Sequence, residues 1–396
     1  MSISLLPEHS NALATFDHVQ RTRLVFGNGM AARTGELSAE LGLKRILIVT
    51  DPGIVRAGHV TTVRKSLEAA GLEVIVFDQV IENPTTDCVE RCRRLAERAG
   101  TDSFLGLGGG SSMDTAKGAN FLLTNGGRMQ DYWGVGLAKR EMLPLIVIPT
   151  TAGTGSECQS FALISDIETH NKMACGDPKA AAKIAILDPE LTLSLPRNVT
   201  ACTGIDAIAH AVETAVTKKR NEKSWMFSKE AFGLLLPNFA TVLNQPDNLN
   251  ARGSMLLGAA LAGCAIEASM LGAAHSTANP LTAEYDIVHG QAVGMMLPHV
   301  VRFNAERGEA SGAYAELATI GKLGQAATSD EAVERLAKRL TKLLEQADMP
   351  VTLRASGVKE SMLTNLATEA AGQWTASFNP REVGQAEMES IYRAAF

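Results

Sequence analysis

An aspartate and three histidines have the residue types and the spacing of a transition-metal site. Asp206 and His210 are four residues apart in a segment rich in Ala, Ile and Val at helical spacing. This spacing places a carboxylate and an imidazole on one helix face, with Cβ atoms about 6 Å apart, and a divalent cation fits between them. His275 and His289 follow downstream. Three imidazoles and one carboxylate suit Fe²⁺ or Zn²⁺ better than Ca²⁺ or Mg²⁺.

The two downstream histidines can share one ion only if the chain turns between them. Fourteen residues of continuous helix would hold them about 21 Å apart. Pro280 lies between them, and because proline breaks helices we expect the chain to fold back there. The alternative is structural, because a histidine in an Ala-rich segment is commonly a hydrogen-bonded residue and Asp-x-x-x-His pairs are frequent on helices. Spacing alone leaves both interpretations open.

A second candidate site is the glycine-rich turn Gly108-Gly109-Gly110-Ser111, which follows the apolar run 103–107. A strand, a glycine turn and a helix start present backbone N–H groups and a positive helix end to a phosphate. A glycine has no Cβ to keep a pyrophosphate away from the backbone. The pattern departs from the usual dinucleotide fingerprint, because Ser111 stands at the third glycine position and the loop follows the third predicted strand. A flexible turn is the alternative.

Two further loops are expected at the same edge of the sheet. Asp51 ends the first predicted strand, where a carboxylate can accept hydrogen bonds from ribose hydroxyls and would repel a 2′-phosphate. This favours NAD over NADP. Residues 149–157 (PTTAGTGSE) follow the fourth predicted strand and supply hydroxyls and backbone donors. As alternatives, Asp51 suits the start of an Asp-Pro-Gly turn, and the Thr and Ser residues suit a helix cap.

Short apolar, β-branched runs alternate with helical patterns in the first half of the chain. They predict strands at 46–49, 74–77, 103–107, 145–148 and 183–187. Such alternation is typical of a parallel sheet with helices on both faces. The strand pattern stops at Pro196, so we expect an α/β domain at 1–195 and an all-helical domain at 196–396. Residues 1 to about 20 lack periodicity and are interpreted as an N-terminal extension.

The composition of the 396 residues is that of an ordinary globular protein, with 45% hydrophobic and 20% charged residues. A net charge of −6 argues against a nucleic-acid or anionic-membrane partner. The short basic run at 218–220 is explained by a solvated turn. The sequence lacks a run of about 18 apolar residues and a signal-peptide pattern, and its six cysteines form no CxxC pair. We therefore expect a cytoplasmic protein with reduced cysteines and no membrane contact.

Five stretches match one known family in order and spacing: 108–117 (GGGSSMDTAK), 149–157, 188–191 (DPEL), 204–210 (GIDAIAH), and the histidines at 275 and 289. Together they closely resemble the iron-containing (group III) alcohol dehydrogenases. The resemblance runs from about residue 22 to the C-terminus, where 379–381 (NPR) and 392–393 (YR) also fit. It implies the dehydroquinate synthase-like architecture, with an N-terminal dinucleotide-binding domain, a helical metal-binding domain and a cleft between them.

The resemblance also implies site residues and an activity. It assigns metal ligation and catalysis to Asp206, His210, His275 and His289. It assigns NAD contacts to Asp51, Asn83, Gly109, Gly110, Ser111, Asp114, Thr150, Thr151, Thr154 and Lys172. It places the substrate near Cys158, Phe161, Ile266, Met270, Trp374 and Thr375, which as apolar residues also suit an ordinary core. The implied reaction is hydride transfer between nicotinamide and a small alcohol or aldehyde bound to Fe²⁺, with Zn²⁺ as the other candidate ion. The implied assembly is a homodimer or a higher homo-oligomer.

One position departs from the family pattern. Members often have a further histidine four residues after the first downstream ligand, beside the nicotinamide, and this chain has Asn279 there. Asparagine can hydrogen-bond but cannot titrate near neutral pH, so no proton relay is expected at this position.

Two other classes of protein were weighed against the dehydrogenase. A dehydroquinate-synthase-type lyase uses the same architecture, NAD and a metal, but it would need several Lys and Arg residues around its acidic substrate. The sequence near His275 and His289 lacks such a set. A nucleotide-binding regulator without turnover would have no need of a complete set of four metal ligands.

Overall fold

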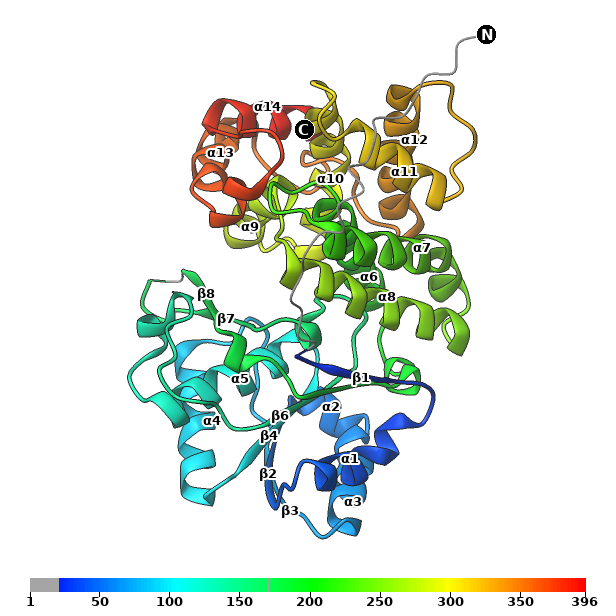
Figure 1. The fold of residues 1–396 in the computed structure, drawn as a ribbon. Helices are drawn as coiled ribbons and strands as arrows, with labels where there is room; N and C mark the ends of the chain where they lie inside the picture. Colours follow the sequence, from blue (N-terminus) through cyan, green and yellow to red (C-terminus); the bar gives the residue numbers. More distant parts are fainter. Residues whose placement is uncertain (1–20, 170) are drawn as a thin grey trace, which may run out of the picture.

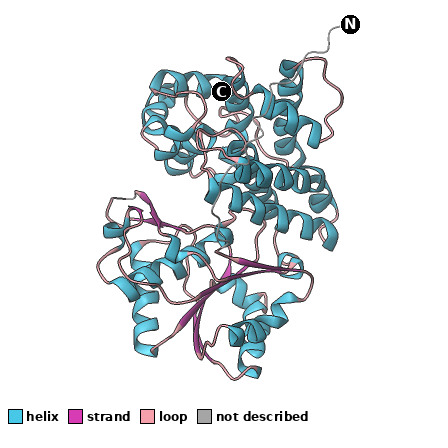
Figure 2. Ribbon diagram, in the orientation of Figure 1, coloured by secondary structure: helices cyan, strands magenta, loops and turns pink. Residues whose placement is uncertain are grey.

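The computed structural model describes residues 21–169 and 171–396, so the predicted N-terminal extension lies outside the described residues. The chain forms two halves that are stacked on one another in Figure 1. The lower half contains the strands, and the upper half is built from helices (Figure 2).

A six-stranded parallel sheet is the centre of the α/β half, with strand order β1-β9-β6-β4-β2-β3. The strands are β1 (Arg23–Phe26), β2 (Arg45–Val49), β3 (Glu73–Phe77), β4 (Ser103–Gly108), β6 (Leu145–Pro149) and β9 (Ile184–Leu187). Five of them confirm the predicted strands. Strand β1 is an edge strand in which Val25 alone is buried, and it was missed because its apolar run, 24–26, is only three residues long. The glycine turn therefore follows the fourth strand of the chain, and its predicted place after the third was wrong.

Helices cover both faces of this sheet, as the apolar strands predict. Figure 1 shows α4 and α5 on one side and α1 and α3 on the other. On one face, Leu47 and Phe104 share a core with Cys92 and Met113. On the other face, Ile48 and neighbouring strand residues share a core with helix α3. The helices of this half are α1 (Thr34–Glu40), α2 (Pro52–Arg56), α3 (His59–Ala69), α4 (Thr86–Ala99) and α5 (Gly110–Asn125).

A second, three-stranded sheet of order β5-β8-β7 packs against helix α5. Its strands are β5 (Gly134–Val135), β7 (Phe161–Ser165) and β8 (Lys172–Gly176), and β7 and β8 are antiparallel. This sheet was not predicted: β5 has only two residues and β8 begins with Lys172 and ends with Gly176, but the apolar run 161–164 of β7 is a strand signal that was overlooked. The sheet matters for function because it holds Phe161 and Lys172 beside the interface between the halves.

The helical half has nine α-helices within residues 197–396, all of which the structure describes. They are α6 (Arg197–Thr214), α7 (Glu222–Asn244), α8 (Leu249–Ala268), α9 (Ala273–Tyr285), α10 (His289–Ala305), α11 (Ser311–Ile320), α12 (Ser329–Gln346), α13 (Leu363–Ala371) and α14 (Gln385–Ala395). This confirms the predicted loss of strands after Pro196. Helix α8 is long and apolar enough to cross a membrane, but 67% of its apolar window is buried inside the protein, as in a core helix. The division at 195/196 into two domains stays a prediction.

The predicted helix break at Pro280 was wrong. Helix α9 continues through Pro280 to Tyr285. Three residues before the proline, the Thr277 carbonyl accepts a 2.6 Å hydrogen bond from the Tyr392 hydroxyl. The helix ends instead at Asp286, whose φ of 53° is left-handed, and α10 starts at His289. The chain therefore reverses six residues later than predicted. The reversal still allows His289 to lie beside His275, as expected.

The two halves meet where the loop after β6 lies against helix α8. Gly155 has a φ of +63°, and a Cβ on this residue would lie 2.6 Å from the Cα of Gly263. Only a glycine allows two backbones to approach this closely. Nearby, the Glu267 carboxylate of α8 accepts hydrogen bonds from the amide and the hydroxyl of Ser160. These contacts fix the loop after β6 relative to the helical half.

Candidate metal and nucleotide site

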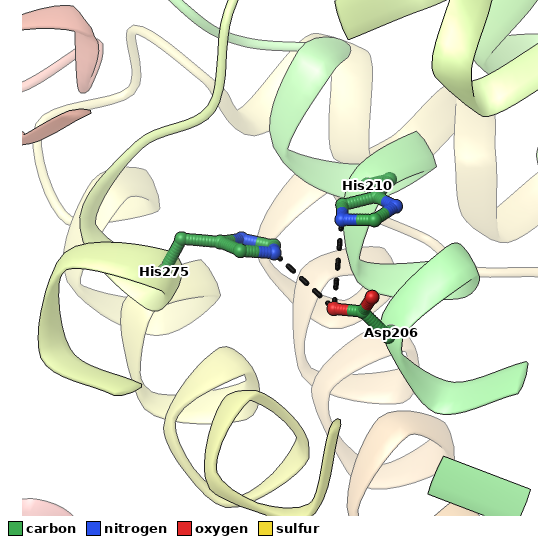
Figure 3. A group of neighbouring side chains, drawn as sticks. All are labelled: Asp206, His210 and His275. Atoms are coloured by element: carbon green, nitrogen blue, oxygen red, sulfur yellow. Dashed lines mark hydrogen bonds and ion pairs between the residues drawn. The ribbon is translucent and has the colours of Figure 1, made fainter. Parts of the chain in front are cut away.

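Helix α6 places Asp206 and His210 on one face, one turn apart, as their spacing predicts. His210 Nε2 lies 3.5 Å from Asp206 Oδ1, and Nε2 of His275, from helix α9, lies 3.3 Å from the same oxygen. The ligand atoms of these three residues all lie within 4.8 Å of one another, and all three residues are buried. Figure 3 shows both imidazoles directed at the Asp206 carboxylate.

His289, the fourth predicted ligand, approaches the same carboxylate from the first residue of helix α10. Its Nε2 atom lies 3.8 Å from Asp206 Oδ1, and its ring centroid lies 5.4 Å from that of His275. The side chain of His289 is 32% exposed, whereas those of the other three are at most 9% exposed. The structure thus brings all four predicted residues together, with the side of His289 open to solvent.

Glu213, which was not predicted as a site residue, orients one of the histidines of this cluster. Its carboxylate accepts a hydrogen bond from Nδ1 of His275 and a 2.7 Å bond from the Ala274 amide. A carboxylate only accepts hydrogen bonds, so the Nδ1 of His275 carries hydrogen and its Nε2 faces Asp206. Carboxylates commonly orient metal-binding histidines in this way. A sequence signal exists, because Glu213 lies three residues after His210 on the same side of α6.

The charges within the cluster follow from these contacts. Burial alone would raise the pKa of Asp206, but the surrounding imidazoles hold it well below its usual value. Burial lowers the pKa of His210, and the surrounding protein lowers that of His289 to about 3, against the attraction of Asp206. For His275, the Glu213 and Asp206 carboxylates outweigh burial and raise the pKa to about 9. Asp206 is therefore ionised and His210 and His289 are neutral, as metal ligands must be, whereas a metal ion would have to displace a proton from His275.

The glycine turn after β4 has the features of a phosphate cradle. Helix α5 begins at Gly110, and its N-cap, Gly109, provides no side-chain cap. The first N–H groups of a helix have no partner within the helix, so this end is available to an anion. A Cβ on Gly110 would lie 2.9 Å from the Thr154 side chain, and one on Gly108 would lie 2.6 Å from the Ser112 hydroxyl. Glycine at 110 lets the loop after β6 lie against the start of α5, and glycine at 108 leaves room for the Ser112 hydroxyl.

Unpartnered hydroxyls gather around this turn. The hydroxyls of Thr50, Ser112 and Thr150 are buried and have no hydrogen-bond partner among the described residues. They lie at the carboxyl ends of β2, β4 and β6, which are neighbouring strands of the sheet. Ligands of open α/β sheets bind at this edge. Buried hydroxyls without protein partners and an uncapped helix start fit a bound dinucleotide.

Asp51 caps a helix and also borders the glycine turn, and its predicted contact with a ribose stays a prediction. Its Oδ1 accepts hydrogen bonds from the amides of Gly53 and Ile54, so it caps helix α2 as the turn alternative expects. Its Oδ2 faces Gly108, lying 3.5 Å from the position of a Cβ there. One carboxylate oxygen is therefore engaged by the turn, and the other lies beside the glycine turn.

Both carboxylate oxygens of Asp114 accept hydrogen bonds from the protein itself. Its Oδ1 accepts a 2.8 Å bond from the Ser156 hydroxyl, and its Oδ2 accepts one from the Leu163 amide. Lys117 is fully buried and donates to the Ser156 carbonyl, the Ser156 hydroxyl and the Phe161 carbonyl. These two residues hold the loop after β6 and strand β7 against helix α5. A direct contact of Asp114 with the cofactor stays a prediction.

Lys172 contacts Asn83, and its charge interacts with residues of both candidate sites. The Lys172 ammonium donates a 3.3 Å hydrogen bond to Asn83 Oδ1. Surrounding protein lowers the pKa of Lys172, against the Asp114 and Asp206 carboxylates, although the side chain still reaches solvent. Lys172 in turn lowers the pKa of His289. One cation is thus close enough to influence both predicted sites.

Four of the six predicted substrate residues are buried, and the other two are aromatic residues in contact with each other. Cys158, Ile266, Met270 and Thr375 are buried. Phe161 of β7 and Trp374, the first residue of the 3₁₀ helix η7 (Trp374–Phe378), have ring centroids 5.9 Å apart.

Helix α9 and the start of η7 are joined near the metal cluster. The Thr375 hydroxyl bonds that of Ser276, next to His275. Asn279, one turn further along α9, donates a 3.0 Å bond to Gln373. Asn279, the position at which no proton relay is expected, is therefore paired with Gln373. Neither side-chain amide can titrate.

An α/β half with an uncapped glycine turn, joined to a helical half with a carboxylate–imidazole cluster, is the arrangement expected of enzymes that use a dinucleotide and a metal ion, among them both the dehydrogenases and the lyases considered above. The family models agree over nearly the whole described chain. Residues 21–189 match the model for iron-containing alcohol dehydrogenase, and residues 200–396 match the C-terminal model of the same family. The chain belongs to the iron-containing alcohol dehydrogenase family and is an oxidoreductase.

Individual relatives support this membership along the full length. The chain is 34% identical to a choline dehydrogenase of Bacillus subtilis, over 100% of this chain and 98% of the relative. It is 32% identical to an NAD-dependent methanol dehydrogenase of Bacillus methanolicus, over 94% and 97%. A crystal structure of a 1,3-propanediol oxidoreductase superposes with a TM-score of 0.92 at 32% identity, over 97% of this chain and 100% of that chain.

These findings also decide between the classes weighed from the sequence. The matched models and these relatives are alcohol dehydrogenases, in agreement with the expected activity. They give no support to the alternative lyase of the dehydroquinate-synthase type. They equally give no support to a regulator without turnover.

Proposed function

We propose that this protein is an NAD-linked dehydrogenase of small alcohols and aldehydes that depends on Fe²⁺, with Zn²⁺ as the other candidate ion. The observation that carries the proposal is the convergence of three imidazoles on one oxygen of Asp206. The nucleotide turn lies in the other half of the molecule, and Lys172 links the two electrostatically.

Asp206, His210, His275 and His289 are the residues that would hold the ion. A divalent cation held there would polarise an alcohol or carbonyl oxygen, and a bound nicotinamide would supply the hydride chemistry. Asp206 contributes the negative charge of the set, and Glu213 fixes His275 in the orientation that turns Nε2 inward. His289 closes the set on its solvent-open side.

The residues around the glycine turn would hold the dinucleotide. The uncapped start of helix α5 at Gly109 and Gly110 suits the pyrophosphate. Ser111, Thr150, Thr151 and Thr154 supply hydroxyls next to this turn. Asp51 Oδ2 suits a ribose hydroxyl and disfavours a 2′-phosphate, which supports NAD over NADP. Support also comes from the methanol dehydrogenase relative, whose name describes it as NAD-dependent.

The reaction requires a path for one proton, and this chain offers no titratable side chain at Asn279. The amide pair of Asn279 and Gln373 can orient a hydroxyl or a water but cannot take up its proton. The partial exposure of His289 leaves water access to the cluster. We propose that the proton leaves through water or the ribose hydroxyls.

Relatives act on choline, methanol and 1,3-propanediol according to their names. A small alcohol is the chemistry that they share. We further propose two domains divided at 195/196, a cytoplasmic location and a homodimer or higher homo-oligomer. Light scattering of the purified protein tests the assembly.

The central experiment combines metal analysis with a screen of activity. Protein purified anaerobically is supplied with Fe²⁺ or Zn²⁺, and the NADH absorbance band is followed with short alcohols and aldehydes. Asp206→Ala and His275→Ala are expected to lose both bound metal and turnover. Retention of metal and full turnover in either variant would refute the ligand assignment.

A separate variant, Gly108→Ala, tests the proposed NAD-binding site. Gly108→Ala would place a Cβ 2.6 Å from the Ser112 hydroxyl at a backbone φ of +144°. Calorimetric titration with NAD is expected to show weaker binding, while the metal content stays unchanged. Unchanged NAD affinity would argue against the cradle.

A further inference from the structure

Residues 379–381 (NPR) fit the family in sequence but have no part in the site described above. The first of them, Asn379, directly follows the 3₁₀ helix η7 and is 1% exposed. Its Oδ1 accepts a 3.2 Å hydrogen bond from the Ala273 amide, 106 positions away in the sequence. Ala273 is the first residue of helix α9 and lies two residues before His275. Asn379 therefore contacts the start of a helix that carries a proposed metal ligand.

Helix α9 has no local side-chain cap, because its N-cap residue is Gly272. The first N–H groups of a helix have no partner within the helix. Two distant side chains supply these partners, since Asn379 and Glu213 accept hydrogen bonds from the first two amides of α9. A Cβ on Gly272 would lie 3.0 Å from Asn379 Oδ1 and 3.3 Å from Glu213 Oε1. Both oxygens thus meet the helix end that immediately precedes His275.

The side-chain amide of Asn379 has one orientation that satisfies its neighbours. Its Nδ2 donates a 2.7 Å hydrogen bond to the Arg381 carbonyl, which can only accept. Its Oδ1 faces the Ala273 amide, which can only donate. The amide of Asn304, which is 2% exposed, pairs reciprocally with that of Asn379 at 2.8 and 3.2 Å. The oxygen that caps α9 is therefore held in place from three sides.

The same segment is also fastened to helix α10, which begins at His289. Arg381 Nη1 donates a 2.7 Å hydrogen bond to the Phe303 carbonyl and pairs with Glu306 at 2.6 Å. Its guanidinium lies 3.6 Å from the centre of the Phe303 ring, at stacking distance. Residues 379–381 therefore connect the start of α9 to the end of α10, the two helices that carry His275 and His289.

We propose that Asn379 is a positioning residue for the metal site, because its side chain fixes the backbone from which His275 reaches Asp206. Glu213 orients the ring of His275, whereas Asn379 holds the helix end that carries this ring. His275 Nε2 lies 3.3 Å from Asp206 Oδ1, and a ligand set must be held to within about 0.5 Å to bind its ion well. This inference rests on the proposed function, since it takes His275 as a metal ligand.

Co²⁺ binding by the full-length protein tests the proposal. Competition with a chelator measures the affinity, and the visible absorption spectrum of bound Co²⁺ depends on the geometry of its ligands. Asn379→Ala is expected to weaken Co²⁺ binding about tenfold, as for other residues that orient metal ligands, and to change the spectrum. Thermal unfolding of the metal-free protein checks that the variant keeps its fold.

Tyr392→Phe is the matched control. It also removes one buried hydrogen bond to α9, the 2.6 Å bond to the Thr277 carbonyl, but this bond lies beyond His275 and not at the helix start. The variant is expected to unfold at a lower temperature and to keep the Co²⁺ affinity and spectrum of the wild type. A loss of affinity as large as that in Asn379→Ala would mean that Asn379 only stabilises the helix, and would overturn the proposal.

Wild-type Co²⁺ affinity and spectrum in a folded Asn379→Ala protein would also overturn it. If that variant does not fold, Asn304→Ala takes its place, because it keeps Asn379 and removes the amide that pairs with it. It is expected to weaken Co²⁺ binding several-fold, and unchanged binding would again contradict the proposal. Failure of the proposed function would look different, since Co²⁺ binding by the wild type would then be absent or insensitive to Asp206→Ala.

Discussion

Nδ1 of His275 donates a hydrogen bond to the Glu213 carboxylate, which orients the opposite nitrogen, Nε2, toward Asp206 at 3.3 Å. Glu213 also accepts a bond from the Ala274 amide, so it fixes both the ring and the start of helix α9. The two residues lie 62 positions apart in the sequence. Helix α6 thus supplies two of the proposed metal ligands, Asp206 and His210, and its Glu213 also orients His275, a proposed ligand on helix α9.

Glu213→Gln is expected to weaken metal binding about 10- to 100-fold, the usual effect of losing a carboxylate that orients a metal-binding histidine. The amide keeps the volume of the side chain but loses its charge. Competition with a chelator of known affinity measures the change. Glu316→Gln, an exposed carboxylate on α11, is the control and is expected to leave metal affinity unchanged. A Glu213→Gln protein that binds metal as tightly as the wild type would contradict this role.

Metal loading is expected to stabilise the native protein. An ion that binds the native state alone adds about 2.7 kcal/mol to the free energy of unfolding at 100 times its dissociation constant. Thermal unfolding of chelator-treated protein, before and after addition of Fe²⁺ or Zn²⁺ without oxygen, measures the effect. Asp206→Asn should abolish most of the increase. An equal increase in that variant would mean that the ion binds elsewhere.

Glu157 is expected to make stability depend on pH. It is 1% exposed, its Oε1 has no partner among the described residues, and burial raises its pKa from 4.5 to about 7. For an acid whose folded-state pKa is raised, the stabilising contribution is full below the unfolded pKa. It is lost as the pH rises from about 4.5 to about 7. The loss amounts to roughly 3 kcal/mol.

Glu157→Gln removes this titration. Urea unfolding at pH 5 and pH 8 should show that the variant gains stability over the wild type by roughly 3 kcal/mol between the two conditions. Glu141→Gln, at an exposed position, is the control and should show no such gain. A difference between Glu157→Gln and the wild type that is independent of pH would rule out Glu157 as the titrating group.

Gly155→Ala is expected to destabilise the contact between the two halves. A Cβ there would lie 2.6 Å from the Cα of Gly263 on α8, and the φ of +63° is unfavourable for alanine. Overpacking and backbone strain together should lower the free energy of unfolding by about 3 kcal/mol. Gly42→Ala is the control that measures the cost of backbone strain alone. Gly42 has a similar φ of +71°, and a Cβ added there would have no neighbouring atom within 4 Å. Equal losses in the two variants would show that the contact contributes nothing.

The sequence predicted the main sheet well and the smaller features poorly. Runs such as 46–49 and 145–148 are buried on both faces, so their composition alone identified them. Strand β1 was missed because its apolar run has three residues, and β7 was missed although 161–164 is an apolar run, because the strands beside it are too short or too polar to indicate a sheet. The break at Pro280 was also misplaced, since the surrounding helices accommodate the proline and Asp286 ends the helix instead.

The sequence by itself determined the local parts of the site. The spacing of Asp206 and His210 fixes one helix face, and Gly108 and Gly110 allow a tight turn in which a Cβ would clash, because both effects act within a few residues. Only the tertiary structure decided that His275 and His289 reach the same oxygen of Asp206 and that Glu213 orients one of them. These relationships depend on where α9 ends and on how α6, α9 and α10 pack, which are properties of distant contacts and not of sequence spacing.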